Sequence, residues 1–133
     1  MLHQELTSAI INAFYTVYNQ LEYGFLEKVY ENALAHELRK RGFQVQQQVP
    51  IKVYYDGVAV GEYFADLLVE EKVILELKAA EEIGIAHEAQ LINYLKATHK
   101  EVGLALNFGP KPAFVRKVYT LKTHKIKNPR KSV

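Results

Sequence analysis

The sequence contains no cysteine. Disulfide bonds, thiolate nucleophiles and zinc or iron–sulfur sites with cysteine ligands are therefore excluded. The chain also lacks an apolar run of 18 residues, so we expect no segment to span a membrane. Its first residues carry an early acid and no basic stretch ahead of an apolar one, unlike a secretory signal. These absences are typical of a cytoplasmic protein, which is what we expect.

Motifs that bind nucleotides or serve serine hydrolases are missing too. The chain has no GxGxxG, no GxxxxGK[ST] and no GxSxG. Its two serines, Ser8 and Ser132, lie near the ends of the chain. A small-molecule enzyme of these classes therefore has little support.

The charges are distributed unevenly along the 133 residues. Residues 1–110 hold 9 Lys and Arg and all 15 Asp and Glu, a net charge of −6. Residues 111–133 hold 8 Lys and Arg and no acid, a net charge of +8. A basic tail on an acidic body indicates a polyanion partner, most simply nucleic acid, although a solvated tail that aids solubility fits equally well.

The apolar pattern predicts one domain, residues 1–121, followed by a loose basic tail, residues 122–133. Helical spacing and chain-ending signals predict three helices, and alternation with turn signals predicts five strands. The predicted order is α-α-β-β-β-α-β-β, an α/β or α+β domain with a mixed sheet. The expected helices are 4–20, 25–41 and 84–98, and the expected strands are 43–55, 58–69, 73–79, 102–108 and 114–121.

The segment 62–79 holds the candidate chemistry. Odd positions from Tyr63 to Val69 and from Val73 to Ala79 are apolar or aromatic, which predicts one apolar face on each strand. Because directly paired residues point to the same face, odd positions must pair with odd positions. This register pairs Val69 with Val73, Leu67 with Leu75 and Ala65 with Leu77.

The same register places Asp66 opposite Glu76, with Lys78 on the same face. Two opposed carboxylates raise each other's pKa unless a cation lies between them, and a hard divalent metal takes such oxygen ligands. Lys78 could then orient water or stabilise charge on a phosphate. The alternative is an ordinary sheet surface with its charges turned to solvent.

Four stretches of the sequence together resemble a known family. Asp66-x9-Glu76-x-Lys78 resembles the signature of the PD-(D/E)XK nuclease superfamily, with Ala65 in place of the usual proline. Gly24-x-x-Glu27-x-x-Tyr30 is similar to the motif that names its GxxExxY family, and HEAQLINYL and LNFG follow in the same order. The resemblance covers residues 5–120 and implies a restriction-endonuclease-like core of a mixed sheet flanked by helices.

The resemblance also implies roles for individual residues. Asp66, Glu76 and the backbone carbonyl of Leu77 would hold Mg²⁺ or Mn²⁺, and Lys78 would be the catalytic lysine. Gln90 and Tyr94 match a Gln-x3-Tyr element on the following helix.

Further residues near these motifs have two interpretations. Glu27 matches an acid that completes the metal site in some members of the superfamily. His87 lies on the side of its helix that carries Gln90, so it could contact a phosphate or base, or simply help begin the helix. Gln90 and Tyr94 share this side, where Gln90 would belong to the catalytic residues and Tyr94 would contact substrate. Half-buried packing is nearly as favoured for Tyr94, and a core position is the favoured one for Tyr30.

Two functions from different classes remain open at this point. The first is a metal-dependent nuclease that hydrolyses phosphodiester bonds in DNA, with RNA as the less favoured substrate. Lys122, Lys125 and Lys127 of the tail would contact phosphates, and specificity would come from nucleic-acid structure, a protein partner or a homodimer. The second is a non-catalytic module that binds nucleic acid or protein and retains only the nuclease fold.

Overall fold

A computed structural model describes residues 2–120 of the chain, which form three helices and five strands. The predicted order of elements is confirmed. The elements along the chain are α1 (Gln4–Leu21), α2 (Glu27–Lys40), β1 (Val45–Tyr55), β2 (Val58–Val69), β3 (Val73–Lys78), α3 (Ile85–Thr98), β4 (Val102–Phe108) and β5 (Pro112–Val118). The tail predicted at 122–133 lies outside the described residues.

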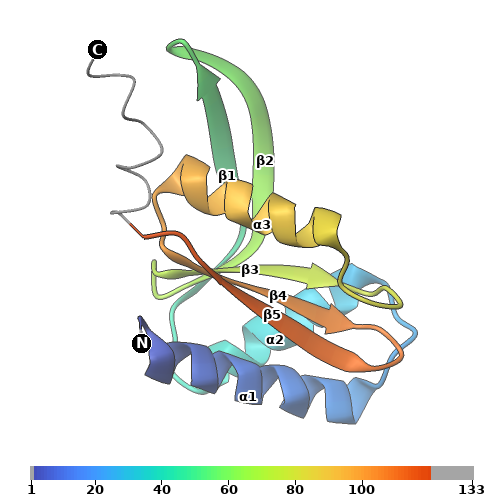
Figure 1. Cartoon of the computed structure of the whole chain (residues 1–133). Helices are drawn as coiled ribbons and strands as arrows, with labels where there is room; N and C mark the ends of the chain where they lie inside the picture. The colour runs from blue at the N-terminus through green and yellow to red at the C-terminus, as the bar shows by residue number, and fades with distance from the viewer. Residues whose placement is uncertain (1, 121–133) are drawn as a thin grey trace.

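The five strands form one mixed sheet in the order β1-β2-β3-β4-β5. β3 and β4 run parallel, and the other neighbours are antiparallel. The parallel pair needs a crossover, which α3 provides. α1 and α2 cover one face of the sheet and α3 covers the other (Figure 1). This is the mixed sheet flanked by helices that the sequence predicts.

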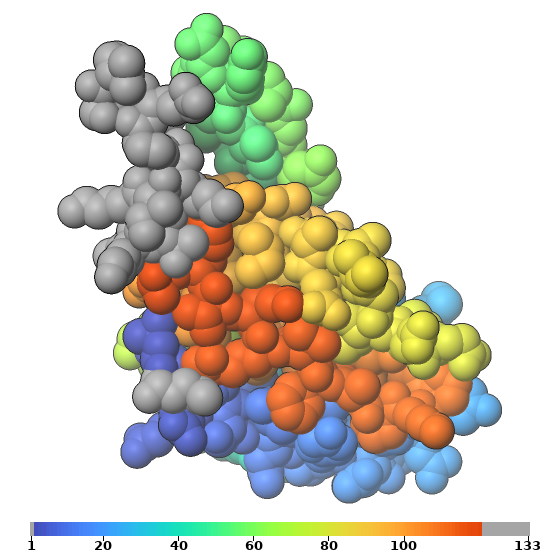
Figure 2. Space-filling view, viewed as in Figure 1, coloured from blue at the N-terminus to red at the C-terminus, as the bar shows by residue number. Residues whose placement is uncertain are grey.

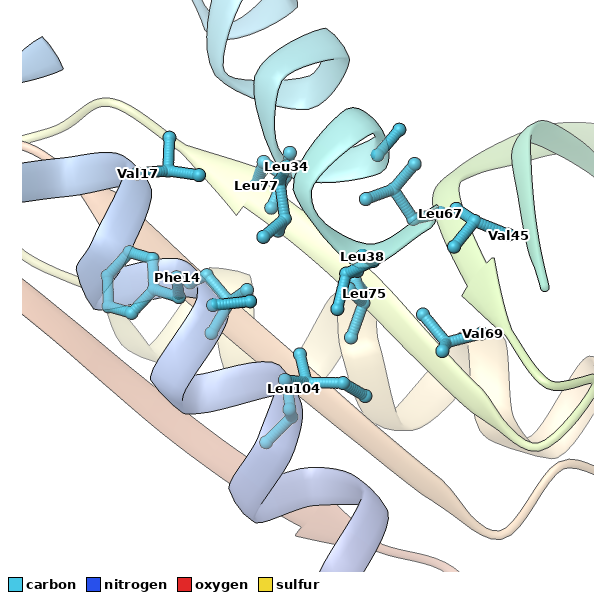
Figure 3. Packing of buried hydrophobic residues seen from close by; sticks show 14 of the residues in the cluster. Phe14, Val17, Leu34, Leu38, Val45, Leu67, Val69, Leu75, Leu77 and Leu104 are labelled. Atoms are coloured by element: carbon cyan, nitrogen blue, oxygen red, sulfur yellow. The ribbon is translucent and has the colours of Figure 1, made fainter. Parts of the chain in front are cut away.

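The larger apolar cluster lies between the sheet and the α1–α2 layer. Its strand residues include Leu67, Leu75 and Leu104, and Phe14 and Leu38 reach it from the two helices (Figure 3). β4 is buried along its whole length because helices cover both of its faces, as its unbroken apolar run predicts. No helix within residues 2–120 is long and apolar enough to cross a membrane.

The Gly24-x-x-Glu27-x-x-Tyr30 segment forms the turn between α1 and α2 and the start of α2. Tyr30 is completely buried, so its predicted core position is confirmed. Its ring stacks on Phe108 of β4 with centroids 4.4 Å apart. Its hydroxyl donates to the Glu22 carbonyl at 2.5 Å and accepts from the Phe25 amide at 3.2 Å. The tyrosine therefore fixes the turn to the core from within.

Beyond the main sheet, β1 and β2 continue as a two-stranded arm that projects past α3 (Figures 1 and 2). The pairing of β2 with β3 covers only residues 67–69 and 73–75, while β1 pairs with β2 from Val45 to Tyr55 with an interruption at Gln48 and Asp66. The β1–β2 register shifts between Val53 and Tyr54, which leaves a bulge in β2 next to Gly61.

The predicted pairing of Ala65 with Leu77 is not present in this ladder. Ala65 pairs with Val49 of β1 instead. Ala65 is buried on the α3 side of the sheet, whereas Leu67, expected on the same face, is buried on the α1–α2 side. The strand therefore twists at Asp66. Opposite this twist, Gln48 of β1 has a φ of 54°, which is rare for a residue other than glycine.

Replacement of Tyr30 by phenylalanine should lower the free energy of unfolding by about 1–2 kcal/mol, because two backbone groups of the α1–α2 turn lose their partner. Urea denaturation measures this. The matched control is Tyr55→Phe at an exposed position, expected to change the free energy by less than about 0.5 kcal/mol. Equal effects for the two variants would contradict the role given to the Tyr30 hydroxyl.

Candidate active site

Asp66 lies at the point where β2 leaves β3. Its Oδ2 accepts a hydrogen bond from the Leu77 amide at 2.8 Å, and its Oδ1 accepts one from Gln48 Nε2 at 3.3 Å. The Asp66 side chain thus provides an acceptor for the β3 backbone beyond Leu75, where the pairing with β2 has stopped. Burial raises the pKa of Asp66 above its usual value, the Leu77 amide lowers it, and the charge of Glu31 raises it again.

Glu76 lies in the middle of β3 and is 5% exposed. Its Oε1 is buried and has no hydrogen-bond partner among the described residues. Burial and the charge of Asp66 raise its pKa to about 8, against the opposing effect of Lys78. The two carboxylates therefore lie close enough to repel each other, although the predicted pairing of Asp66 with Glu76 is not present in the β2–β3 ladder, which stops at Leu67 and Leu75. A buried carboxylate oxygen without a donor is costly unless a proton or a cation satisfies it.

Lys78, Gln90 and Tyr94 form a continuous polar chain between β3 and α3. Lys78 Nζ donates to Gln90 Oε1 at 3.2 Å, and Gln90 Nε2 donates to the Tyr94 hydroxyl at 3.0 Å. Tyr94 is 6% exposed. Burial raises its pKa to about 12, with further contributions from the charges of Glu76 and Asp66. The structure thus brings the residues of the predicted lysine and Gln-x3-Tyr elements next to the two carboxylates.

Glu27 and His87 lie nearby, and each makes a hydrogen bond to the backbone. Glu27 Oε2 accepts from the Ala79 amide at 3.1 Å, so the first turn of α2 reaches the end of β3 one residue past Lys78. His87 Nδ1 accepts from the Gly84 amide at 3.2 Å and caps the start of α3. This contact matches the simpler interpretation of His87, and its contact with substrate stays a prediction.

Glu31 is a further acid beside the site that no sequence motif singled out, and it is 3% exposed. Its carboxylate accepts from Lys28 Nζ at 3.1 Å, Gln47 Nε2 at 2.8 Å and Gln48 Nε2 at 2.7 Å. Since Gln48 also donates to Asp66, Glu31 is connected to the metal-ligand candidate through one amide. The sequence does contain an indication of this role, because Glu31 follows Glu27 by four residues and therefore lies on the same face of α2.

Asn107 of β4 holds the segment that follows Lys78. Its Oδ1 accepts from the Ala80 amide at 3.0 Å and its Nδ2 donates to the Ala80 carbonyl at 2.9 Å. Gly109 approaches the same residue so closely that a Cβ there would lie 1.8 Å from the Ala80 oxygen. Both residues belong to the LNFG stretch singled out in the sequence. That stretch therefore fixes the chain where it leaves the end of β3.

Within residues 2–120, no group of three or more His, Asp or Glu side chains is arranged to hold a metal ion. Two carboxylates, Asp66 and Glu76, and the backbone of Leu77 make up the candidate ligand set. Lys122, Lys125 and Lys127 lie outside the described residues.

Comparison with known proteins agrees with this geometry. Residues 4–118 match the PD-(D/E)XK nuclease superfamily. The chain belongs to this superfamily. PD-(D/E)XK nucleases generally use divalent metals, and nucleic acid is the substrate that the name of the superfamily indicates. Membership of the GxxExxY family stays a prediction.

The fold of this PD-(D/E)XK chain is also similar to a solved structure titled "Crystal structure of SSO0001". The TM-score is 0.54 at 19% sequence identity, which supports the fold alone. The similarity covers 79% of this chain and 56% of that one, so this chain spans little more than half the length of the protein it resembles. No match was found among curated proteins.

The buried carboxylates predict how the stability of the metal-free chain depends on pH. Glu76 has a pKa near 8 in the folded protein, above its ordinary value of 4.5, and that of Asp66 is raised too. The folded state therefore binds more protons than the unfolded state in this range, and the free energy of unfolding falls as the pH rises from about 4.5 to 8. One proton contributes at most about 1.4 kcal/mol per pH unit.

Glu76→Gln should flatten this slope, because glutamine does not ionise. Urea denaturation in EDTA at several pH values between 5 and 8 measures it. The matched control, Glu82→Gln at an exposed position, should keep the slope of the unchanged protein. A Glu76→Gln slope equal to that of the control would contradict the burial of an ionisable group at this position.

Proposed function

We propose that this chain is a metal-dependent nuclease that hydrolyses phosphodiester bonds in DNA. The observation that supports this most directly is the Glu76 carboxylate, which is buried beside Asp66 with one oxygen that lacks a donor. A structural glutamate would be expected to use its oxygens in hydrogen bonds. A carboxylate with an unused oxygen, next to a second carboxylate and a lysine, suits a cation.

The residues present fit a divalent ion such as Mg²⁺ or Mn²⁺. Asp66 and Glu76 would bind it with their carboxylates, and Leu77 with its carbonyl. The Leu77 amide already points to Asp66 across the open edge of β3. In an extended strand the N–H and the C=O of one residue point to the same side, so the Leu77 carbonyl faces the same edge. Glu27 is a further candidate, because its carboxylate lies at the end of the same strand.

The lysine and glutamine would carry the proton and charge chemistry. A bound divalent metal polarises the scissile phosphate and lowers the pKa of an attacking water. Lys78 holds a positive charge on the same side of β3 as Glu76, where it would orient that water or stabilise negative charge on the phosphate. Gln90 accepts a hydrogen bond from the Lys78 ammonium, so it fixes the position of the charge. Tyr94 in turn fixes Gln90.

A binding module without catalysis is the second candidate. The observation in its favour is that the described side chains include no cluster of three acidic or imidazole ligands. Such a module would not need to bind metal. Metal binding therefore separates the two functions before any substrate is known.

Lys78→Met should lower the rate of Mg²⁺-dependent cleavage of DNA by about 10²–10⁴-fold, because the group that handles the proton or charge is lost. Asp66→Ala should abolish Mn²⁺ binding in calorimetry and cleavage together. Circular dichroism confirms that each variant is folded.

The matched control is Lys72→Met, an exposed lysine in the β2–β3 turn, which should keep the full rate. Linear, nicked, flapped and branched DNA and RNA serve as substrates. Mn²⁺ binding that is absent, or unchanged in Asp66→Ala, would contradict the proposed metal site and favour the binding module.

The tail would add affinity without sequence preference, because lysine contacts with phosphates release counterions and carry no base information. Deletion of residues 122–133 removes five Lys and Arg and no acid. The slope of log K against log salt on duplex DNA should shrink by at most about 4.5, and we expect roughly half of that. Equal slopes with and without the tail would contradict the proposal. A full-length variant in which these five Lys and Arg residues are replaced by glutamine distinguishes the effect of the lost charge from the effect of the shorter chain.

A further inference from the structure

Tyr63 is an exposed aromatic residue beside the candidate active site. It lies on β2, three residues before Asp66, and its side chain is 49% exposed. Its pairing partner on β1 is Ile51, which is buried in the apolar cluster on the α3 side of the sheet. Paired residues share a face, so Tyr63 points toward α3.

The ring of Tyr63 meets the ring of Tyr94 of α3, with centroids 5.7 Å apart and planes tilted by 42°. The hydroxyl of Tyr94 accepts from Gln90, which accepts from Lys78. Tyr63 therefore lies one contact beyond the polar chain that leads to the carboxylates. One side of its ring is supported by Tyr94, and about half of the side chain is open to solvent.

This exposure separates Tyr63 from the aromatic residues that serve the core. Tyr30 is fully buried and Tyr94 is 6% exposed. An aromatic ring that contacts a buried neighbour and is about half exposed to solvent offers a flat apolar surface. Nucleobases stack on such surfaces whatever their sequence, because every base has a π face.

We propose that Tyr63 is a stacking platform for an unpaired nucleobase next to the cleaved phosphate. The faces of bases inside an intact duplex are already covered by their neighbours, so the ring can stack only on a base that is single-stranded, flapped or frayed. The substrate class is therefore single-stranded DNA or the single-stranded part of a branched DNA. This inference rests on the proposed function, whose site supplies the neighbouring phosphate.

The net charge of the β1–β2 arm favours a single-stranded ligand at Tyr63 over duplex DNA bound along the arm. Residues 49–64, which make up most of the β1–β2 arm, carry one lysine and two acids, a net charge of −1. Recognition of a duplex depends mainly on cationic contacts with phosphates, which this segment does not offer. A stacked base needs no such charge at the ring itself.

A single tryptophan can report the stacking directly, because the chain contains none. In Tyr63→Trp without added metal, an oligothymidylate of about 12 nucleotides should quench the tryptophan emission, and a duplex of equal length should quench it far less. The matched control is Tyr55→Trp at the tip of the arm, which is 75% exposed. Its emission should change little with either DNA. Equal quenching in the two variants, or none in Tyr63→Trp, would overturn the inference.

Kinetics provide the second readout. Tyr63→Ala should lower kcat/KM on single-stranded DNA by about 5- to 160-fold, which corresponds to the stacking free energy of one base on an aromatic side chain. On blunt duplex DNA the change should stay within about 2-fold, and Tyr63→Phe should keep most of the single-strand rate. Tyr55→Ala should alter neither rate. Equal losses on both substrates would overturn the inference.

The two proposals fail in different ways. If no form of the protein cleaves DNA with Mg²⁺ or Mn²⁺, the nuclease proposal fails, and the emission of the Tyr63→Trp variant still decides whether a base stacks there. If cleavage depends on Asp66 and Lys78 but neither the emission nor the strand preference responds at position 63, the nuclease proposal stands and the stacking platform is excluded.

Discussion

The hydrogen bond from the Leu77 amide to Asp66 Oδ2 is the interaction on which the arrangement of the site depends. β2 pairs with β3 only over residues 67–69, so the backbone of β3 beyond Leu75 would have an open edge without another partner. The carboxylate of Asp66 fills this position with an acceptor. The same carboxylate then lies at the open edge of β3, next to Glu76 and Lys78, which flank Leu77 in the sequence. Separation of the two strands and assembly of the charged groups are thus one structural event, because a continuous ladder would bury the edge in strand pairing.

The second layer of the site comes from helices that lie on opposite faces of the sheet. α2 contributes Glu27 and Glu31, which reach the edge from the α1–α2 side, while α3 contributes Gln90 and Tyr94 from the other side. The edge of β3 is accessible to both layers only because β2 has turned away. Each acid in the site therefore has a different environment: Asp66 is held by donors, Glu31 is satisfied by amides and a lysine, and Glu76 has one oxygen without any.

The sequence predicted the order of elements and the pairing of β2 with β3 near their turn, because period-2 alternation fixes which strand residues share a face. Leu67 pairs with Leu75 and Val69 with Val73, as the burial argument requires. It did not predict the twist at Asp66, because alternation assumes a regular strand and carries no information on where pairing stops. Ala65 therefore faces the opposite side from the one expected. Glu31 was missed because a buried acid is recognised by its partners, and Gln47 and Gln48 become its neighbours only after folding.

The clamp of Asn107 on Ala80, and the close approach of Gly109, bear on how much order the site must gain when a substrate arrives. Both hydrogen bonds of the Asn107 amide hold the backbone just past Lys78, and this asparagine is fully buried within β4. The end of β3 thus loses its conformational freedom as the sheet forms, at the expense of the free energy of folding. A phosphate that reaches the lysine would meet a group already in position, and the entropy of binding would be lost chiefly by the ligand.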